Sequence, residues 1–264
     1  MKSNLYSIVA YLRYLVQSRT SYSVHSPFVF SLVGQVINDH SENQSFTEIA
    51  DLRDALFRNA RQLEITDFGT GSGSREFIHR FASVSSIARN SGMNNKYGKL
   101  LYRLVAWFKP HTIIEIGTSL GLSTTYLAKA APKANIFTIE GCATKSQQAA
   151  SNFNKLGISN VEVQIGSFNI VLPALVKKTA SVDFVFIDGN HSYKPTLSYF
   201  RLLLQIAHND TVFVFDDIHW SPEMTKAWKE IINHEHVTVS VDLFRMGIVF
   251  IRKELSKQHF VIRY

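Results

Sequence analysis

The chain has 264 residues, 45% hydrophobic and 19% charged, a composition typical of a globular protein with one large α/β domain or a core domain and a smaller appendage. Its single cysteine, Cys142, excludes an intramolecular disulfide and predicts a reducing, cytoplasmic setting. The net charge of +7 comes from basic residues that are scattered rather than clustered, so we expect no nucleic-acid partner.

The first predicted element, residues 5–16 (LYSIVAYLRYLV), is apolar but too short to span a bilayer, and Arg13 interrupts it. We expect an amphipathic helix that packs on the body of the protein or on a second subunit, with attachment to a membrane surface as the alternative. No signal-peptide cleavage pattern follows, and no stable membrane insertion is expected. Farther on, His25 and Ser26 either line an acceptor pocket or precede a helix that begins at Pro27, with His25 packed.

Two short apolar runs each lead through an acidic residue into a glycine-rich loop, at residues 65–74 (ITDFGTGSGS) and 113–123 (IIEIGTSLGLS). A cofactor-binding α/β sheet requires only one such loop, at the end of its first strand. After Asp67 the chain shows helical spacing with a Gly/Asn-rich break and no strand, so no sheet continues beside the first loop. We therefore predict that Glu115 belongs to the cofactor loop.

The other loop then needs a role of its own. We interpret residues 65–98 either as a mobile lid over the active site or, equally, as a plain surface turn that leads into a helix. The hinges of such a lid would be Gly69, Gly71, Gly73 and Gly98.

Strands and helices alternate along the rest of the chain. Predicted strands cover 111–117, 134–140, 161–167, 182–189 and 211–217, and a two-stranded hairpin covers 237–252. Predicted helices cover 122–131, 143–157, 195–207 and 221–232. Pro132 and Gly157 end two of these helices, and Ser221 with Pro222 opens the last. This alternation predicts a mostly parallel α/β sheet.

Four segments, EIGTSLGLS, FTIEG, FIDGNHSY and FDDIHW, together resemble the class I S-adenosylmethionine-dependent methyltransferases. Within that class they are similar to the small-molecule O-methyltransferases of the catechol and caffeoyl-CoA type and their bacterial relatives. The resemblance covers about residues 100–252. It implies a Rossmann-like, seven-stranded sheet in strand order 3-2-1-4-5-7-6 with an antiparallel C-terminal hairpin. We divide the chain into a helical N-terminal extension, 1–98, and a cofactor-binding core, 99–264.

The cofactor implied is S-adenosylmethionine. Gly117 and Gly121 let the backbone approach a ligand closely, and the following helix offers N–H groups for the methionyl carboxylate. Ser119 replaces the middle glycine of the dinucleotide pattern, which disfavours NAD. Glu140, at the end of the second strand, can accept hydrogen bonds from both ribose hydroxyls; the alternative is a solvated acid in a turn.

Many relatives place an acid after the third strand to bind the adenine amino group. This chain has Ser167 there, followed by Phe168, which can pack on the adenine ring. The predicted cofactor-binding residues are Glu115, Gly117, Thr118, Ser119, Gly121, Ser123, Glu140, Gly141, Ser167, Phe168 and Asp188.

The resemblance places Asp188 near the methyl-donating sulfonium, and the predicted catalytic residues are Asp188, His191 and Asp216. Asp216 and Asp217 end the neighbouring strand, and three carboxylates with few basic neighbours repel one another unless a cation lies between them. Asp188, Asp216 and Asp217 are therefore candidate ligands for Mg²⁺ or Mn²⁺, which would bind two substrate oxygens and acidify the attacking hydroxyl.

Two departures from the metal-dependent relatives bear on this site. Asp216-Asp217 stands where they usually have Asp-Asn, and His191 stands where they commonly have lysine. His191 can act as a general base near neutrality or, with His219, as a metal ligand. The alternative is that the acids only cap helices and His191 bonds the backbone.

We expect an S-adenosylmethionine-dependent methyltransferase that acts on a hydroxyl of a small-molecule acceptor, with a homodimer implied by the resemblance alone. A nucleic-acid methyltransferase usually carries an Asn/Asp-Pro-Pro-aromatic segment where this chain reads DGNHSY. An NAD-dependent oxidoreductase fits the glycine spacing and the terminal hairpin less well. A non-catalytic protein that binds S-adenosylmethionine stays open, because cofactor residues alone do not establish turnover.

Overall fold

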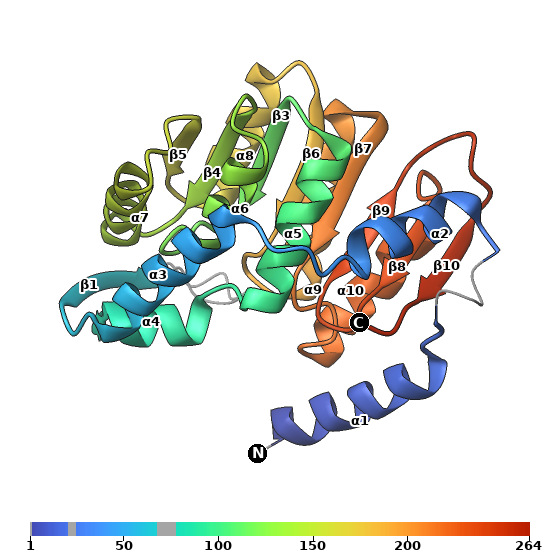
Figure 1. The fold of residues 1–264 in the computed structure, drawn as a ribbon, viewed down its shortest axis with the longest axis horizontal. Helices are drawn as coiled ribbons and strands as arrows, with labels where there is room; N and C mark the ends of the chain where they lie inside the picture. Colours follow the sequence, from blue (N-terminus) through green and yellow to red (C-terminus); the bar gives the residue numbers. More distant parts are fainter. Residues whose placement is uncertain (1, 21–24, 68–77) are drawn as a thin grey trace. The chain divides into compact units, whose positions relative to one another are not determined.

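The computed structural model describes residues 2–20, 25–67 and 78–264 (Figure 1). Gly69, Gly71 and Gly73 of the predicted lid lie outside the described residues. The chain forms two compact units. We call His40–Lys178 the middle unit, and we call Met1–Asp39 together with Thr179–Tyr264 the terminal unit. Nowhere in the described ranges is a helix both long and apolar enough to cross a membrane.

The middle unit contains three parallel strands with a helix after each. The strands are β3 (Thr112–Ile116), β4 (Asn135–Glu140) and β5 (Val161–Ile165), hydrogen-bonded in the order β3-β4-β5. The helices are α6 (Leu122–Ala130), α7 (Ala143–Lys155) and α8 (Phe168–Lys178). β3 is buried over nearly its whole length because its residues are β-branched and apolar, as in a strand covered on both faces. These strands were predicted from the sequence and are confirmed.

The first part of the middle unit corrects the expectation that no strand precedes the core. Helix α3 (Gln44–Arg58) leads into an antiparallel hairpin of β1 (Gln62–Asp67) and β2 (Ile78–Ser83), followed by α4 (Val84–Ser91) and α5 (Asn95–Phe108). β1 alternates buried Leu63 and Ile65 with exposed Glu64, the period of a half-buried strand. The hairpin joins α7 through Thr66 N, which donates to Cys142 Sγ at 3.4 Å.

Gly98 lies inside α5, where its absent side chain allows close packing. A Cβ atom on Gly98 would lie 2.2 Å from Cε2 of Tyr126. Close packing against Tyr126 gives Gly98 a structural role in α5, and the hinge role stays a prediction.

The terminal unit contains strands in the order β6-β7-β9-β8-β10. β6 (Val182–Ile187) and β7 (Ala207–Phe215) are parallel, β9 (Gly247–Phe250) is antiparallel to β7 and to β8 (Val239–Asp242), and β10 (Gln258–Val261) is parallel to β8. In the expected strand order, β5-β4-β3 of the middle unit corresponds to 3-2-1, and β6-β7-β9-β8 of the terminal unit corresponds to 4-5-7-6. β10 is additional to the expected strands. Helices α9 (Tyr193–Leu203) with the 3₁₀ turn η3 (Leu204–Ile206), and α10 (Pro222–Asn233), complete this part.

The N-terminal segment of the terminal unit is helical. It comprises α1 (Lys2–Gln17), α2 (Pro27–Leu32) and the π-helical turn η2 (Val33–Ile37). Ser26 caps α2, because its Oγ accepts a hydrogen bond from Val29 N at 3.4 Å and Pro27 takes the first helical position. The prediction that Pro27 begins a helix is confirmed, whereas His25 is exposed and not packed.

Candidate functional site

The loop after β3 has a backbone that only a few residue types adopt readily. Gly117, Ser119 and Gly121 have φ angles of 104°, 49° and 82°. Gly121 is the N-cap of α6, and a Cβ atom there would lie 2.6 Å from Cε1 of Phe153. The N–H groups of Gly117 and Thr118 donate to Ile139 O at 3.0 and 3.2 Å. The loop is therefore held tightly against the end of β4.

Glu115 lies beneath this loop and is fully buried. Its Oε2 accepts hydrogen bonds from Thr124 Oγ1 of α6 and, at 2.6 Å, from Thr138 Oγ1 of β4. Burial raises the pKa of the Glu115 carboxyl, against hydrogen bonds from Ser123, Thr124 and Thr138 that lower it. Its Oε1 is buried and has no hydrogen-bond partner among the described residues. Glu115 thus connects the strand to the helix and leaves one buried acceptor unpaired.

Glu140, at the end of β4, fixes the position of the loop from the other side. Its Oε2 accepts from Ser119 N at 2.8 Å, and its Oε1 accepts from Cys142 N at 2.9 Å. Each carboxylate oxygen keeps a further lone pair for a ligand hydroxyl. The sequence predicted the position of Glu140 but not these two N–H donors, because they depend on the left-handed backbone of Ser119 and on the turn after β4.

Other predicted cofactor residues lie on the same loop or at neighbouring strand ends. Thr118 is buried and its hydroxyl lies 2.6 Å from that of Thr138. Gly141 follows Glu140 directly. Ser167 and Phe168 follow β5, whose last residue, Ile165, pairs with Glu140. The middle unit therefore brings together the predicted residues Glu115, Gly117, Thr118, Ser119, Gly121, Ser123, Glu140, Gly141, Ser167 and Phe168.

The terminal unit brings together the predicted acidic residues. Asp188 follows β6, and Asp216 and Asp217 follow β7, whose end pairs with the end of β6 through Phe215 and Ile187. Asp216 N donates to Ile187 O at 2.9 Å, which keeps the two strand ends together. Asp217 has a φ of 54°, a strained value for a residue with a side chain.

Arg245, which sequence reasoning missed, is the main cation of this cluster. Its Nε and Nη2 donate to the two carboxylate oxygens of Asp216 at 3.2 and 3.1 Å, a bidentate pair. Nε also lies 3.3 Å from Asp217 Oδ1. Arg245 comes from the turn between β8 and β9, and β9 begins where β7 ends because those strands are antiparallel. That predicted strand order was the signal that could have placed Arg245 beside Asp216.

His191 and Arg245 approach different carboxylate oxygens of Asp217: His191 lies near Oδ2, and Arg245 lies near Oδ1. Its Nε2 is 3.5 Å from Asp188 Oδ1 and 4.0 Å from Asp217 Oδ2, and its side chain is 29% exposed. Burial and the neighbouring Asp216 raise the pKa of Asp217, while His191 and Arg245 lower it. His191 is thus a partly accessible imidazole beside two carboxylates, as a general base requires.

The acidic cluster does not fit a divalent cation as arranged. No three His, Cys, Asp or Glu side chains within the described ranges are grouped so that they could hold a metal ion. Both oxygens of Asp216 are bonded to Arg245, and one oxygen of Asp217 is paired with the same guanidinium. A divalent cation would have to displace Arg245 to gain these ligands.

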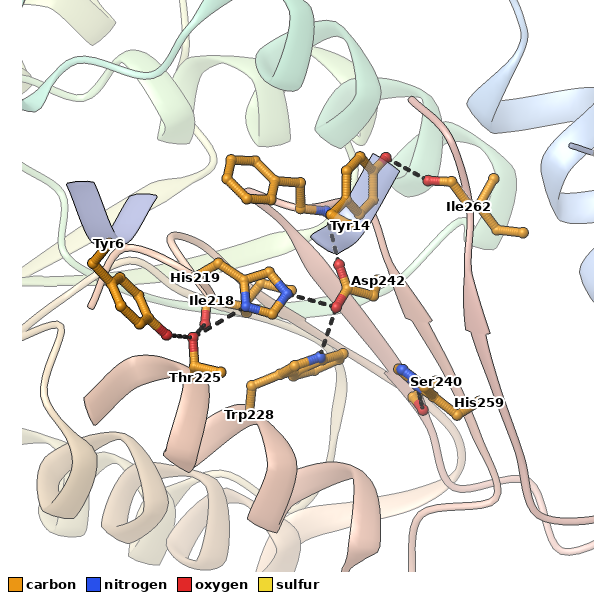
Figure 2. A network of polar contacts seen from close by, with 11 residues as sticks. Tyr6, Tyr14, Ile218, His219, Thr225, Trp228, Ser240, Asp242, His259 and Ile262 are labelled. Atoms are coloured by element: carbon orange, nitrogen blue, oxygen red, sulfur yellow. Dashed lines mark hydrogen bonds and ion pairs between the residues drawn. The ribbon is translucent and has the colours of Figure 1, made fainter. Parts of the chain in front are cut away.

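His219 belongs to a separate network around Asp242 (Figure 2). Asp242 Oδ2 accepts from His219 Nε2 at 2.7 Å and from Trp228 Nε1 at 3.2 Å, and Oδ1 accepts from Phe244 N at 2.8 Å. His219 Nδ1 lies 3.1 Å from Thr225 Oγ1. Because both ring nitrogens are bonded within the protein, His219 is not placed as the metal ligand considered from the sequence.

Comparison with known proteins supports this reading of the fold. Residues 114–218 match a family model described as a methyltransferase domain. The chain is 32% identical over 124 residues to catechol O-methyltransferase of Niastella koreensis, covering 46% of this chain and 55% of the relative. It therefore spans little more than half the length of that relative.

Solved structures share the fold at low sequence identity. The O-methyltransferase TomG of Streptomyces achromogenes, in complex with S-adenosylmethionine, gives a TM-score of 0.57 at 19% identity, covering 80% of this chain and 91% of that one. The S-adenosylhomocysteine-bound methyltransferase PaMTH1 of Podospora anserina gives 0.61 at 14% identity, covering 87% and 98%. Residues 114–218 thus resemble a methyltransferase domain, and the chain shares the fold of these two methyltransferase structures. The matched segment is also 30% identical over 123 residues to catechol O-methyltransferase of Mycobacterium tuberculosis, covering 46% of this chain and 54% of that relative.

Proposed function

We propose that the protein transfers the methyl group of S-adenosylmethionine to a hydroxyl oxygen of a small acceptor. The observation that carries the proposal is the Glu140 carboxylate, held at the end of β4 by Ser119 N and Cys142 N. It lies beside a positive-φ loop at the start of a helix, which is a favourable place for a ribose and a carboxylate.

The residues of the middle unit fit such a cofactor. Glu115 Oε1 is a buried acceptor without a partner among the described residues, and the positive φ angles of Gly117 and Gly121 shape the loop at the start of α6. Gly117 to Gly121 would bind the methionyl end, Glu140 the ribose hydroxyls, and Ser167 with Phe168 the adenine. When bound, the cofactor supplies an electrophilic methyl group on a sulfonium.

In the terminal unit, His191 is the base in this proposal. Its Nε2 would accept the proton of the acceptor hydroxyl, and Asp188 Oδ1 at 3.5 Å would stabilise the imidazolium formed. Asp216 acts through Arg245, whose guanidinium it holds. The proposed reaction does not require a divalent cation, because Asp216 and Asp217, which would bind one, are already paired with Arg245.

Calorimetric titration with S-adenosylhomocysteine tests the cofactor part of the proposal. We expect a Kd in the micromolar range, about −8 kcal/mol, for the wild type, and a loss of at least tenfold in Glu140→Gln. Glu162→Gln is the matched control, since Glu162 is an exposed acid on the adjacent strand β5. NAD should not bind. The proposed cofactor would be contradicted if the protein did not bind S-adenosylhomocysteine, or if it bound NAD instead.

Turnover is tested with S-adenosylmethionine and a panel of hydroxylated acceptors, with catechol as the first probe. His191→Gln should lower kcat at least a hundredfold while the affinity for S-adenosylhomocysteine stays within twofold. Binding of S-adenosylhomocysteine without methylation of any panel member would favour the non-catalytic alternative. Unchanged kcat in His191→Gln would remove His191 as the base.

A further inference from the structure

The carboxylates of the acidic cluster in the terminal unit lie close to side-chain nitrogens of the protein itself. Asp188, Asp216 and Asp217 offer six carboxylate oxygens, and five of them lie within 4.0 Å of a nitrogen of Arg245 or His191. Asp216 is the most deeply buried of the three residues, at 1% exposure, and both of its oxygens are used by one guanidinium.

The guanidinium is also fixed by the fold. Arg245 lies in the short turn between β8 and β9, and its carbonyl oxygen accepts from Ile218 N at 3.1 Å. The same turn is closed by Leu243 N, which donates to Met246 O at 2.9 Å. A planar donor held at both backbone and side chain is preorganised, unlike an ion that must be recruited from solution. The Arg245 side chain is 34% exposed, so one edge is accessible from solvent.

We infer that Arg245 takes the place of a divalent cation at this strand edge: it offsets one of the two negative charges of Asp216 and Asp217, occupies three of their four oxygens, and makes the site independent of metal. The positive charge available to an acceptor oxygen is then a fixed guanidinium rather than Mg²⁺ or Mn²⁺. The role in methyl transfer rests on the proposed function, whereas the competition between Arg245 and a metal ion does not.

Mn²⁺ titration, followed by the electron paramagnetic resonance of free Mn²⁺, tests this directly on the full chain. The wild type should bind no Mn²⁺ at this cluster below about 1 mM. Arg245→Met uncovers the carboxylates and should gain a site at least tenfold tighter. Adding Asp216→Asn should abolish the gained site. Arg201→Met, which removes an arginine paired with Glu230 on the same unit, is the matched control and should gain nothing.

Micromolar Mn²⁺ binding by the wild type that Asp216→Asn removes would overturn the inference, as would a folded Arg245→Met variant that gains no site. If Arg245→Met fails to fold, Arg245→Gln, which also removes the charge but keeps a polar side chain, takes its place with the same expected gain of a site. Titration of the same samples with S-adenosylhomocysteine separates the two proposals. Loss of cofactor binding with the expected Mn²⁺ pattern would remove the proposed function and leave the role of Arg245 in place.

Discussion

At the scale of single residues, two glycines have similar positive φ angles but different neighbouring atoms. Comparing them shows which properties of glycine the cofactor loop requires. Gly121 and Gly157 have φ angles of 82° and 64°. A Cβ atom on Gly121 would meet Phe153 at 2.6 Å, whereas one on Gly157 would meet nothing within 4 Å. The first glycine is required by both conformation and space, and the second by conformation alone.

Substituting each by alanine separates the two requirements. Gly157→Ala should lower the free energy of unfolding by ~1 kcal/mol through backbone strain, with unchanged affinity for S-adenosylhomocysteine. Gly121→Ala adds a steric conflict, so we expect a loss of ~3 kcal/mol and at least tenfold weaker binding. Urea unfolding and calorimetry measure both effects. Equal losses of stability would mean that the loop yields to Phe153 without cost.

Residue types alone also explain why the site was only partly predictable. Glu140 and Asp188 could be found because each acid ends a strongly apolar strand, β4 or β6. Arg245 could not be found by composition, because it lies 29 residues from Asp216 and becomes its neighbour only through the register of β9 on β7. The N–H groups that hold Glu140 depend on backbone dihedral angles, which side-chain patterns do not encode.

At the scale of elements, the buried strands were predictable and the short half-exposed strands were not. β6 and the second half of β7, residues 211–215, read as mostly apolar runs because they are almost entirely buried. β1 and β2 are paired over six residues that mix polar and apolar types, a pattern shared with loops and helices. β10 has only four residues, QHFV, and exists because the edge of β8 is available to pair with it.

Helix α1 is held to α10 and to the residues that follow β10 by hydrogen bonds of its tyrosines. Tyr14 OH donates to Ile262 O at 2.6 Å, and Tyr6 OH donates to Thr225 Oγ1 at 2.7 Å (Figure 2). Tyr14 OH also accepts from Tyr264 N at 2.9 Å. Burial raises the pKa of Tyr14 from 10.0 to about 12, with the Tyr264 N–H acting in the opposite direction.

This pKa gives a pH dependence with a definite sign. The folded state keeps the Tyr14 proton longer than the unfolded state, so its contribution is fully present below pH 10 and is lost as the pH rises from 10 to about 12. The loss should approach ~2 kcal/mol. Urea unfolding of the wild type and Tyr14→Phe across this range measures it, because the other titrating groups are common to both. Parallel curves would show that Tyr14 is not the group responsible.

At the scale of the whole molecule, α1 also presents apolar side chains to solvent. Leu5, Ile8, Leu12 and Val16 are 66%, 56%, 56% and 88% exposed, at a spacing that places them along one helix face. Such a stripe is unusual on an isolated protein and typical of an interface.

We expect two copies of the chain to associate through this face. Leu12→Glu should weaken the dimer at least tenfold, because an unpaired charge would be buried in an apolar contact. Gln17→Glu, which adds the same charge at another exposed position of α1, should leave it within twofold. Sedimentation equilibrium measures both. A wild type that is monomeric at micromolar concentration would contradict the expectation.

The terminal unit is built from two segments that are far apart in the sequence, and it therefore cannot be completed until the second segment has been synthesised. Tyr14 and the Ile262 carbonyl that it binds are 248 positions apart, so a ribosome working at about 5–20 residues per second makes them tens of seconds apart. The middle unit is contiguous and can fold within that interval. Helix α1, which is synthesised before the C-terminal residues that it contacts, is therefore among the last elements to reach its native contacts. The incompletely synthesised chain, in which the apolar side chains of α1 have not reached their native contacts, is the form most in need of a chaperone.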